Sequence, residues 1–224
     1  MNGISVVIPA FNASAYLAEA VESVRAQTLQ PAEIIVVDNA STDDTAELAL
    51  RLGTRLEREP ELGAAHARNR GIAVAKGSFI AFLDSDDLWL PDKLALQSEA
   101  FRNDPGLDAV FGMLGQFISP ELTPEESAGI HCPAEAFPAR LPSIMLAKSS
   151  VFGRIGLFST RWKRAEAVEW IVRAEGMGIR HAIPPHVMAR RRLHLNNVGV
   201  RLKEYNSEYL TIIRENMLRR RATT

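Results

Sequence analysis

The chain has 224 residues, of which 46% are hydrophobic and 24% charged, and its formal net charge is −1 at pH 7. These values are typical of a globular protein and exclude a disordered chain or a broadly basic nucleic-acid binder. The single cysteine, Cys132, excludes an intrachain disulfide. No apolar run approaches the roughly 20 residues of a membrane span and no basic signal-peptide start is present, so we expect a cytoplasmic protein.

Strands alternate with helices in the first hundred residues. Short apolar runs predict strands at 4–9, 33–38 and 79–83. The segment 55–59 is predicted to be an edge strand, because its charged residues would protect an exposed sheet edge. Helical spacing and capping signals predict helices from Ser14 or Asn12 to Gln27, from the polar turn 39–44 to Leu52, from Gly63 to Ala75, and from Pro91 to Asn103. Such repeats indicate a mainly parallel sheet with right-handed crossovers.

The remaining chain predicts less regular structure. A strand is expected at 108–118, followed by a proline-rich loop or mobile flap at 119–142. Beyond it we expect a short helix at 141–146, an extended segment at 149–152, a helix at 165–177, strands at 182–183 and 187–191, a polar loop at 192–199, and a long amphipathic helix from Val200 to Arg221.

Three carboxylates, Asp84, Asp86 and Asp87, follow the strand at 79–83 within four residues. That strand would deliver them to the carboxyl edge of the sheet, where ligands bind in open α/β folds. Clustered carboxylates repel one another unless a cation lies between them, and Mg²⁺ or Mn²⁺ suits carboxylate and phosphate oxygens. We therefore predict a metal–diphosphate site; the alternative is that an Asp caps the helix near Pro91.

Two further side chains are expected at the same edge, Asp38 at the end of a strand and Arg68 on the helix at 63–75. A carboxylate can accept from a base or ribose, and a guanidinium can fork onto a phosphate, so the set predicts nucleotide recognition. The first strand is followed by no Gly-x-Gly-x-x-Gly, and the chain has no Gly-Lys-Ser/Thr loop. Both absences count against a dinucleotide fold and a P-loop enzyme.

Four segments that carry these residues, 6–12, 34–43, 67–71 and 82–89, resemble family 2 glycosyltransferases of the GT-A fold. The resemblance implies a single α/β domain, Rossmann-like, with a mainly parallel central sheet flanked by helices. It also implies an inverting enzyme of polysaccharide biosynthesis that moves a sugar from a nucleotide-diphosphate sugar, most often a UDP-sugar, to a hydroxyl acceptor. Mn²⁺ or Mg²⁺ would be the cofactor.

The resemblance assigns nucleotide-binding roles residue by residue, to Pro9, Phe11, Asn12, Asp38, Arg68 and Asp84. Asp38 would receive the base, and Asp84 would approach the ribose and the sugar phosphate. Asn39 stands where the family more often has an acidic residue, so altered nucleotide contacts are expected.

Asp86 would bind the metal, and the segment 192–197 is similar to a loop that closes over the diphosphate and metal. His194 in that segment is a second candidate metal ligand, because neutral histidine commonly binds metals. The alternative is an ordinary loop histidine.

The acceptor side departs from the family. Its helix usually starts with Glu-Asp, and the Asp is the general base, but here that position is Ala167. Glu166 and Glu169 flank it and are the candidate catalytic residues, because an inverting transfer needs a carboxylate to take the acceptor proton. Alternatively Glu169 pairs with Arg173 and Glu166 favours the helix start. The chain would then be a nucleotide-sugar-binding protein with weak or lost transfer.

With the resemblance, residues 1–118 are expected to form a nucleotide-sugar-binding half, 119–199 an acceptor-side half with the flexible loop 119–142, and 200–224 a C-terminal helix, in one structural domain. Expected partners are a nucleotide-sugar donor and a saccharide, lipid-linked or other hydroxyl acceptor, and not nucleic acid. Secondary expectations are a homo-oligomer and a weak contact of Arg219–Arg221 with the inner face of the membrane.

Overall fold

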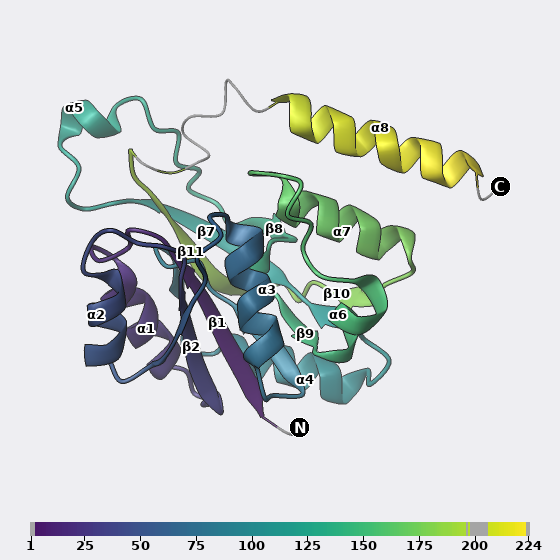
Figure 1. Cartoon of the computed structure of the whole chain (residues 1–224), viewed down its shortest axis with the longest axis horizontal. Coiled ribbons are helices and arrows are strands. Elements are labelled where there is room, and N and C mark those ends of the chain that lie inside the picture. Colours follow the sequence, from purple (N-terminus) through teal and green to yellow (C-terminus); the bar gives the residue numbers. More distant parts are fainter. Residues whose placement is uncertain (1–2, 196, 198–205, 223–224) are drawn as a thin grey trace.

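The computed structural model describes residues 3–195, 197 and 206–222 (Figure 1). Its strands are β1 (Ile4–Ala10), β2 (Glu33–Asp38), β3 (Arg55–Arg58), β4 (Phe79–Phe82), β5 (Leu88–Trp89), β6 (Ala109–Val110), β7 (Gly112–Ile118), β8 (Phe137–Ala139), β9 (Leu146–Lys148), β10 (His181–Ala182) and β11 (Val187–Leu193). Its helices are α1 (Leu17–Arg25), α2 (Thr45–Arg51), α3 (Ala64–Val74), α4 (Lys93–Asn103), α5 (Pro124–Ser127), α6 (Ser150–Ile155), α7 (Glu166–Gly176) and α8 (Asn206–Ala222), with a 3₁₀ turn η1 (Pro142–Ile144).

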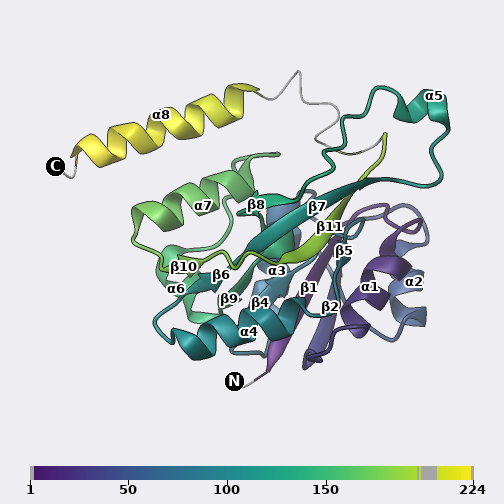
Figure 2. The same cartoon turned by 180° about the vertical axis from the view of Figure 1, so that it is seen from behind.

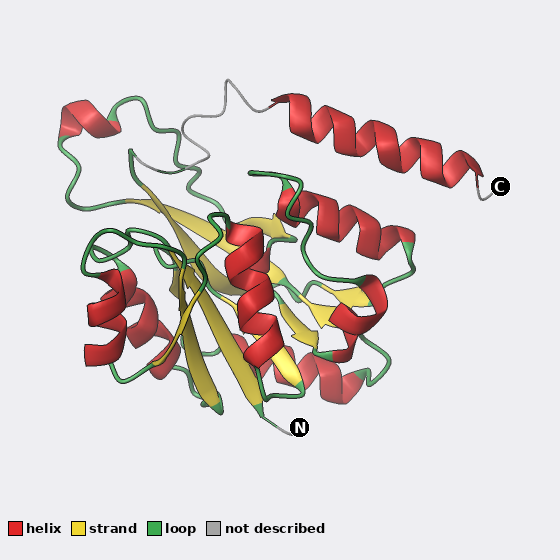
Figure 3. Cartoon of the chain, viewed as in Figure 1, coloured by secondary structure: helices red, strands yellow, loops and turns green. Residues whose placement is uncertain are grey.

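The strands form a seven-stranded sheet in the order β10-β6-β9-β4-β1-β2-β3 and a four-stranded sheet in the order β5-β11-β7-β8 (Figure 3). Strands β1 to β4 are parallel, as predicted, and most of their apolar residues are buried, while Ile34 and Leu56 are partly buried. Helix α3 lies across the face seen in Figure 1, and α4 lies on the face seen in Figure 2. The predicted mainly parallel α/β sheet flanked by helices is therefore confirmed.

Both halves of the chain build the central sheet. Strand β9 is antiparallel to β4 on one side and to β6 on the other, so residues beyond the predicted boundary complete the sheet begun by β1 to β4. The predicted strand at 108–118 is divided, because β6 pairs in the central sheet while β7 pairs with β11 and β8 in the smaller one. The smaller sheet thus brings β11 beside the carboxyl end of β4 through β5.

Three local predictions and one alternative interpretation are wrong. The segment predicted to be extended at 149–152 is helical, in α6, and the predicted helix at 141–146 is only η1 followed by β9. Helix α1 begins at Leu17 with no side-chain cap, because Asn12 bonds the 39–44 turn instead. No acidic-cluster residue caps α4, since β5 separates that cluster from the helix and Asp92 is the N-cap.

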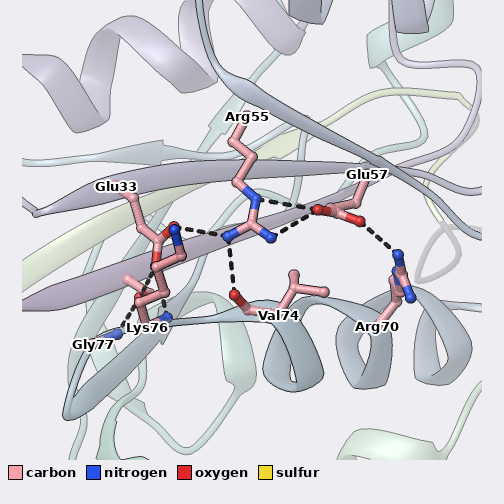
Figure 4. A network of polar contacts seen from close by, with 8 residues as sticks. Glu33, Arg55, Glu57, Arg70, Val74, Lys76 and Gly77 are labelled. Carbon is pink, nitrogen blue, oxygen red and sulfur yellow. Dashed lines mark hydrogen bonds and ion pairs between the residues drawn. The ribbon is translucent and has the colours of Figure 1, made fainter.

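Charge on the edge strand β3 is organised into a polar network with α3 (Figure 4). Arg55 bonds Glu57 on its own strand at 2.9 Å, Glu33 on β2 at 3.2 Å and the Val74 carbonyl at 2.9 Å. Glu57 also pairs with Arg70 at 2.7 Å. These bonds tie the C-terminal part of α3 to the sheet edge. Charged side chains on an edge strand also protect that edge from pairing with another strand.

The last helix, α8, packs beside α7 (Figure 1). A small second core of Trp162, Ala165 and Ile212 lies between them. Ile213 remains exposed, so apolar residues occur on both sides of the described part of α8. The predicted helix residues 200–205 lie outside the described residues. Within the described ranges no helix is both long and apolar enough to span a membrane.

Candidate functional site

The predicted nucleotide-binding residues gather at the carboxyl edge of the central sheet. Ala10 and Asp38 are register partners at the ends of β1 and β2, so Phe11 and Asn12 leave the sheet beside Asp38. Asp84 follows the end of the adjacent strand β4. Phe11 is 52% exposed, which leaves its ring open at this edge. The edge predicted from strand order is the one observed.

Asn12 and Asp38 also shape the 39–44 turn. Asn12 has a left-handed φ of 47°, and its side-chain oxygen accepts a hydrogen bond of 2.8 Å from the Thr42 amide. The Asp38 carboxylate accepts from the Ser41 amide at 3.2 Å. Both side chains therefore fix the turn that borders the predicted base pocket.

Asn39 is buried and bonds the loop between β3 and α3. Its amide nitrogen donates to the carbonyls of Glu59 and Glu61 at 3.0 and 2.7 Å, and its oxygen accepts from the Gly63 amide at 2.7 Å. A carboxylate at this position could not donate to two carbonyls. The departure from the family pattern thus has a local structural role.

The polar run Arg68–Arg70 of α3 sends its side chains in three directions. Arg68 points to the site, Asn69 bonds the backbone of Phe158 at 2.8 and 3.0 Å, and Arg70 reaches the Glu57 edge network (Figure 4). Gly71 lies against Val7, where a Cβ would approach within 2.2 Å of a methyl carbon. Close packing of α3 on β1 therefore sets the depth at which Arg68 lies.

Arg68 joins two carboxylates that are distant in sequence. Its Nη2 donates to Asp84 Oδ1 at 2.8 Å, and its Nη1 donates to Glu166 Oε1 at 2.7 Å. Burial alone would lower the pKa of Arg68, but attraction to both carboxylates outweighs it, so that pKa is raised. Arg68 Nε and Glu166 Oε2 are buried and have no hydrogen-bond partner among the described residues. The network is thus only partly satisfied.

The two predicted metal ligands meet at the end of β11. His194 Nε2 lies 3.0 Å from Asp86 Oδ2, to which Asn197 Nδ2 also donates at 3.2 Å. No group of three His, Cys, Asp or Glu side chains forms a metal-binding cluster in the described part of the chain. Asp84 does not complete one, because Arg68 holds it. An oxygen and a nitrogen donor side by side nevertheless fit one edge of a divalent-metal site.

Asp87 and Arg192 fasten β11 to the acidic cluster. Asp87 is buried, and its Oδ1 accepts from the Arg192 amide at 3.0 Å. Burial and then the charges of Asp86 and Asp84 raise the pKa of Asp87 well above its usual range. The Arg192 guanidinium is also buried and donates to the Asp86 carbonyl at 3.0 Å. These two buried residues therefore bond β11 to the segment that carries Asp86 and Asp87.

The two candidate catalytic glutamates lie in different surroundings. Glu166 belongs to the Arg68–Asp84 network, whereas Glu169 forms two bonds to Arg173, at 2.9 and 3.0 Å. Arg173 also donates to the Leu157 carbonyl at 2.7 Å, away from that network. The structure therefore brings Glu166 together with the donor-edge residues and leaves Glu169 in the i,i+4 pair that was the alternative interpretation.

Tyr16, Ser119 and Glu121 were not among the predicted site residues. Tyr16 packs its ring against His194, with centroids 4.8 Å apart, and donates its hydroxyl to Glu121. No motif or spacing marks these three residues, because they come together only through the placement of α1, β7 and β11.

Comparisons with known proteins agree with the fold. The profile of the family described as Glycosyl transferase family 2 matches residues 5–147. Glycosyltransferase GlyG of Streptococcus pneumoniae is 46% identical over 91 residues, which cover 38% of this chain and 30% of GlyG. WfgD of Escherichia coli, named UDP-Glc:alpha-D-GlcNAc-diphosphoundecaprenol beta-1,3-glucosyltransferase, is 33% identical over 132 residues, covering 53% of this chain and 51% of WfgD. The chain thus spans about half or less of these relatives.

Two solved structures share the fold. Staphylococcus aureus TarS 1–349 in complex with UDP-GlcNAc has a TM-score of 0.72 at 18% identity, covering 96% of this chain and 66% of that one. The mannosyltransferase PcManGT of Pyrobaculum calidifontis, in complex with GDP-Man and Mn²⁺, has a TM-score of 0.65 at 24% identity, covering 88% of this chain and 58% of that one. The likeness in fold extends over most of the chain, beyond the residues that the family profile matches.

Proposed function

The chain belongs to glycosyl transferase family 2, and from that premise we propose that it is an inverting glycosyltransferase that uses a nucleotide-diphosphate sugar and a divalent metal. One observation carries the proposal. The buried guanidinium of Arg68 joins Asp84 at the donor edge to Glu166 at the start of the acceptor-side helix. A transferase needs its donor and its acceptor to be held at one place. The two contacts of Arg68 support such an arrangement, because they link the residues proposed to face each substrate.

We propose a UDP-sugar as the donor. Pro9, Phe11, Asn12 and Asp38 border the pocket for the base, with Asp84 and Arg68 nearer the ribose and sugar phosphate. WfgD is named for UDP-Glc, and the TarS structure holds UDP-GlcNAc, whereas PcManGT holds GDP-Man. Uracil is therefore the first base to test and guanine the second.

Asp86 and His194 would hold the metal, Mn²⁺ or Mg²⁺. Their adjacent oxygen and nitrogen atoms support this assignment. A bound divalent ion would supply charge stabilisation for the departing nucleotide diphosphate. The backbone of Asp86 is also fixed, because its carbonyl accepts a hydrogen bond from Arg192. This bond helps to position the Asp86 carboxylate.

We propose Glu166, rather than Glu169, as the general base. As the acceptor hydroxyl oxygen bonds the anomeric carbon, its proton would pass to a carboxylate and the bond to the nucleotide diphosphate would break. Glu166 is tied to the donor edge through Arg68, and Glu169 is tied to Arg173. The alternative function, nucleotide-sugar binding with weak or lost transfer, is favoured by Ala167 and by the ion pairs that already engage both glutamates.

For the acceptor we propose a saccharide or lipid-linked hydroxyl. The name of WfgD specifies a diphosphoundecaprenol-linked sugar as its acceptor. An acceptor of that kind would place the reaction at the inner face of the membrane, in a protein otherwise cytoplasmic. The side chains of Arg219–Arg221, which would contact anionic lipid, lie outside the described side chains.

Calorimetric titration with UDP, GDP and their sugars, with and without Mn²⁺, tests the proposal. We expect Mn²⁺-dependent binding of one nucleotide series, with affinity lost at least tenfold in Asp86→Ala, which lies between β4 and β5. The control Asp92→Ala, which removes an exposed carboxylate on the other side of β5, should retain it. Absence of metal-dependent binding by the native chain at millimolar nucleotide would overturn both the transferase and the binding-protein proposals.

A further inference from the structure

Tyr16 lies between the metal side of the site and residues 119–142. This segment was predicted to be a long loop or mobile flap, but in the structure it contains the short helix α5 and the strand β8, which pairs with β7; it is called the flap below. Its ring centroid is 4.8 Å from that of His194 and 4.8 Å from the Arg192 guanidinium carbon. Arg192 and His194 are two residues apart at the end of β11, so their side chains leave the backbone on the same side. One aromatic ring therefore packs against both side chains that approach Asp86 from β11.

The Tyr16 hydroxyl reaches the flap. It donates to Glu121, which also accepts from the Ser119 hydroxyl at 2.6 Å. Ser119 in turn accepts from Arg192 Nη1 at 3.2 Å, and its amide donates to the Leu193 carbonyl at 2.9 Å. The first residues of the flap are thus bonded to α1 through Tyr16 and to β11 through Ser119.

The charges in this cluster favour an ionised Glu121 and a neutral Tyr16. Hydrogen bonds from Ser119 and then Tyr16 lower the pKa of Glu121 to about 2. A hydrogen bond to an ionised acceptor is stronger than one between neutral groups. The Tyr16–Glu121 contact is therefore a suitable fastening for the flap.

We propose that Tyr16 is a positioning residue that holds His194 against Asp86, and that its hydrogen bond to Glu121 latches the flap beside the donor site. The first part rests on the proposed function, because it gives His194 and Asp86 their role toward a metal. The second part rests only on the contacts of Tyr16, Ser119 and Glu121.

The two parts are linked through Arg192, which contacts the Tyr16 ring, Ser119 and the Asp86 carbonyl. Any ligand that binds the latched arrangement more tightly must favour a closed latch, and opening the latch must weaken that ligand by the same factor.

Variants at Tyr16 and Glu121 separate the ring from the hydroxyl. Tyr16→Leu removes the ring, and we expect its affinity for Mn²⁺ alone, measured by calorimetry, to fall about tenfold, as for residues that orient metal ligands. Tyr16→Phe and Glu121→Gln keep the ring on His194 and should bind Mn²⁺ within about twofold of the native chain. Both should raise the protease cleavage rate of the flap about fivefold, through loss of one hydrogen bond.

Matched controls are Tyr209→Phe, which removes a tyrosyl hydroxyl on α8, and Glu125→Gln, which removes an exposed carboxylate elsewhere in the flap. Neither should change Mn²⁺ affinity or cleavage. If native and Tyr16→Leu chains bind Mn²⁺ equally, the positioning role is refuted and the proposed function stands. If cleavage is unchanged in both Tyr16→Phe and Glu121→Gln, the latch is refuted.

The experiment also gives an answer if the native chain does not bind metal and nucleotide, or if Tyr16→Leu does not fold. If the native chain shows no metal-dependent nucleotide binding, the proposed function and the positioning role fail together, while flap cleavage still tests the latch. If Tyr16→Leu does not fold, as judged by its thermal melt, Tyr16→Met repeats the metal titration with a side chain that fills the gap flexibly. An unchanged Mn²⁺ affinity in that variant refutes the positioning role equally.

Discussion

The donor edge and the start of α7 present their carboxylates in opposite ways. The side chains of Asp84 and Asp86 are 37% and 30% exposed, open to an incoming ligand. Those of Glu166 and Glu169 are 7% and 11% exposed. Arg173 pairs with Glu169, and Arg68 pairs with Glu166 as well as with the more exposed Asp84. The difference indicates that, under the proposed function, a ligand can reach Asp84 and Asp86 at the surface, whereas Glu166 would have to be uncovered before it meets an acceptor.

The largest effect expected is on transfer in Glu166→Gln. Removing a general base lowers the rate by about 10²–10⁴-fold, and the amide cannot take a proton. Glu169→Gln should leave the rate close to native, because its partner Arg173 lies outside the Arg68 network. Transfer and hydrolysis of the sugar nucleotide would be followed with the nucleotide identified by calorimetry, at equal occupancy of the donor site.

Ala167→Asp provides the complementary change. Placed in the Glu166→Gln chain, it restores a carboxylate at the position where the family has its base, and we expect part of the lost rate to return. The opposite pattern would break the assignment. If Glu166→Gln and Glu169→Gln both match the native chain while Ala167→Asp alone gains activity, neither Glu166 nor Glu169 serves as the base.

Stability should respond next most strongly, to Arg68→Met. The change leaves Glu166 buried without its counter-charge, which typically costs about 3–5 kcal/mol of unfolding free energy. Asp84 contributes less to that cost, since its side chain is 37% exposed and water can replace the arginine. Urea denaturation of the native chain and the variant gives the difference.

The double variant Arg68→Met, Glu166→Leu should recover much of the loss, because replacing a whole buried pair by apolar groups is often nearly neutral. Arg140→Met is the contrasting control. It removes a half-exposed partner of Glu175, and exposed pairs contribute about 1 kcal/mol or less. Equal destabilisation by Arg68→Met and Arg140→Met would show that the two ends of the site are not joined through Arg68.

The donor edge could be predicted because its information is local. Apolar runs of strand length set β1, β2 and β4, and in a parallel sheet their last residues must share one edge. Asp38, Asp84 and Asp86 therefore followed from strand ends. The chain does not carry a comparable signal for β9, whose three residues are strand only because they pair with β4 and β6.

The contacts of the site could not be predicted, because they join distant segments. Arg68 meets Glu166 across 98 residues, and Tyr16 meets Glu121 across 105. Asn39 shows a second limit of prediction from sequence. Its presence in place of an acidic residue predicts altered nucleotide contacts, yet its side-chain amide bonds three backbone groups of one loop. The same types of polar residue can bond the backbone or bind a ligand. Only their positions in the tertiary structure distinguish the two roles.

A smaller effect is expected at Glu208 on α8, which contacts the segment just before α7. Its carboxylate accepts from the amides of Lys163 at 3.3 Å and of Arg164 and Ala165 at 3.2 Å, just before α7, whose N-cap has no side-chain hydrogen bond. Glu208→Ala should cost about 1 kcal/mol of stability, as for loss of a helix cap. Thermal melts measure it.

Glu208→Gln keeps an acceptor oxygen and should lose less than the alanine variant. Neither change should alter nucleotide affinity, because the donor edge makes no described bond to α8. A loss of nucleotide binding comparable to that of Asp86→Ala would contradict the separation between the two regions.

The smallest effect is the pH dependence of the flap at the donor edge. The pKa of Glu121 is lowered from 4.5 to about 2, so its contribution to the closed latch is complete above pH 4.5 and is lost as pH falls toward 2. The pKa of Tyr16 is raised from 10.0 to about 12, so its contribution is complete below pH 10 and is lost as pH rises toward 12. Between these limits flap cleavage should not vary with protonation of the latch.

Alkaline titration of tyrosine absorbance tests the upper limit directly. The difference between native and Tyr16→Phe chains isolates the Tyr16 phenolate, which should form near pH 12 and not near pH 10. Glu121→Gln removes the negative charge that opposes ionisation, so it should move the Tyr16 titration back toward 10, although burial and the nearby Arg192 still act on the ring. A native Tyr16 that ionises near pH 10 would mean that Glu121 does not hold its hydroxyl in solution, and the flap would then be fastened to β11 by Ser119 alone.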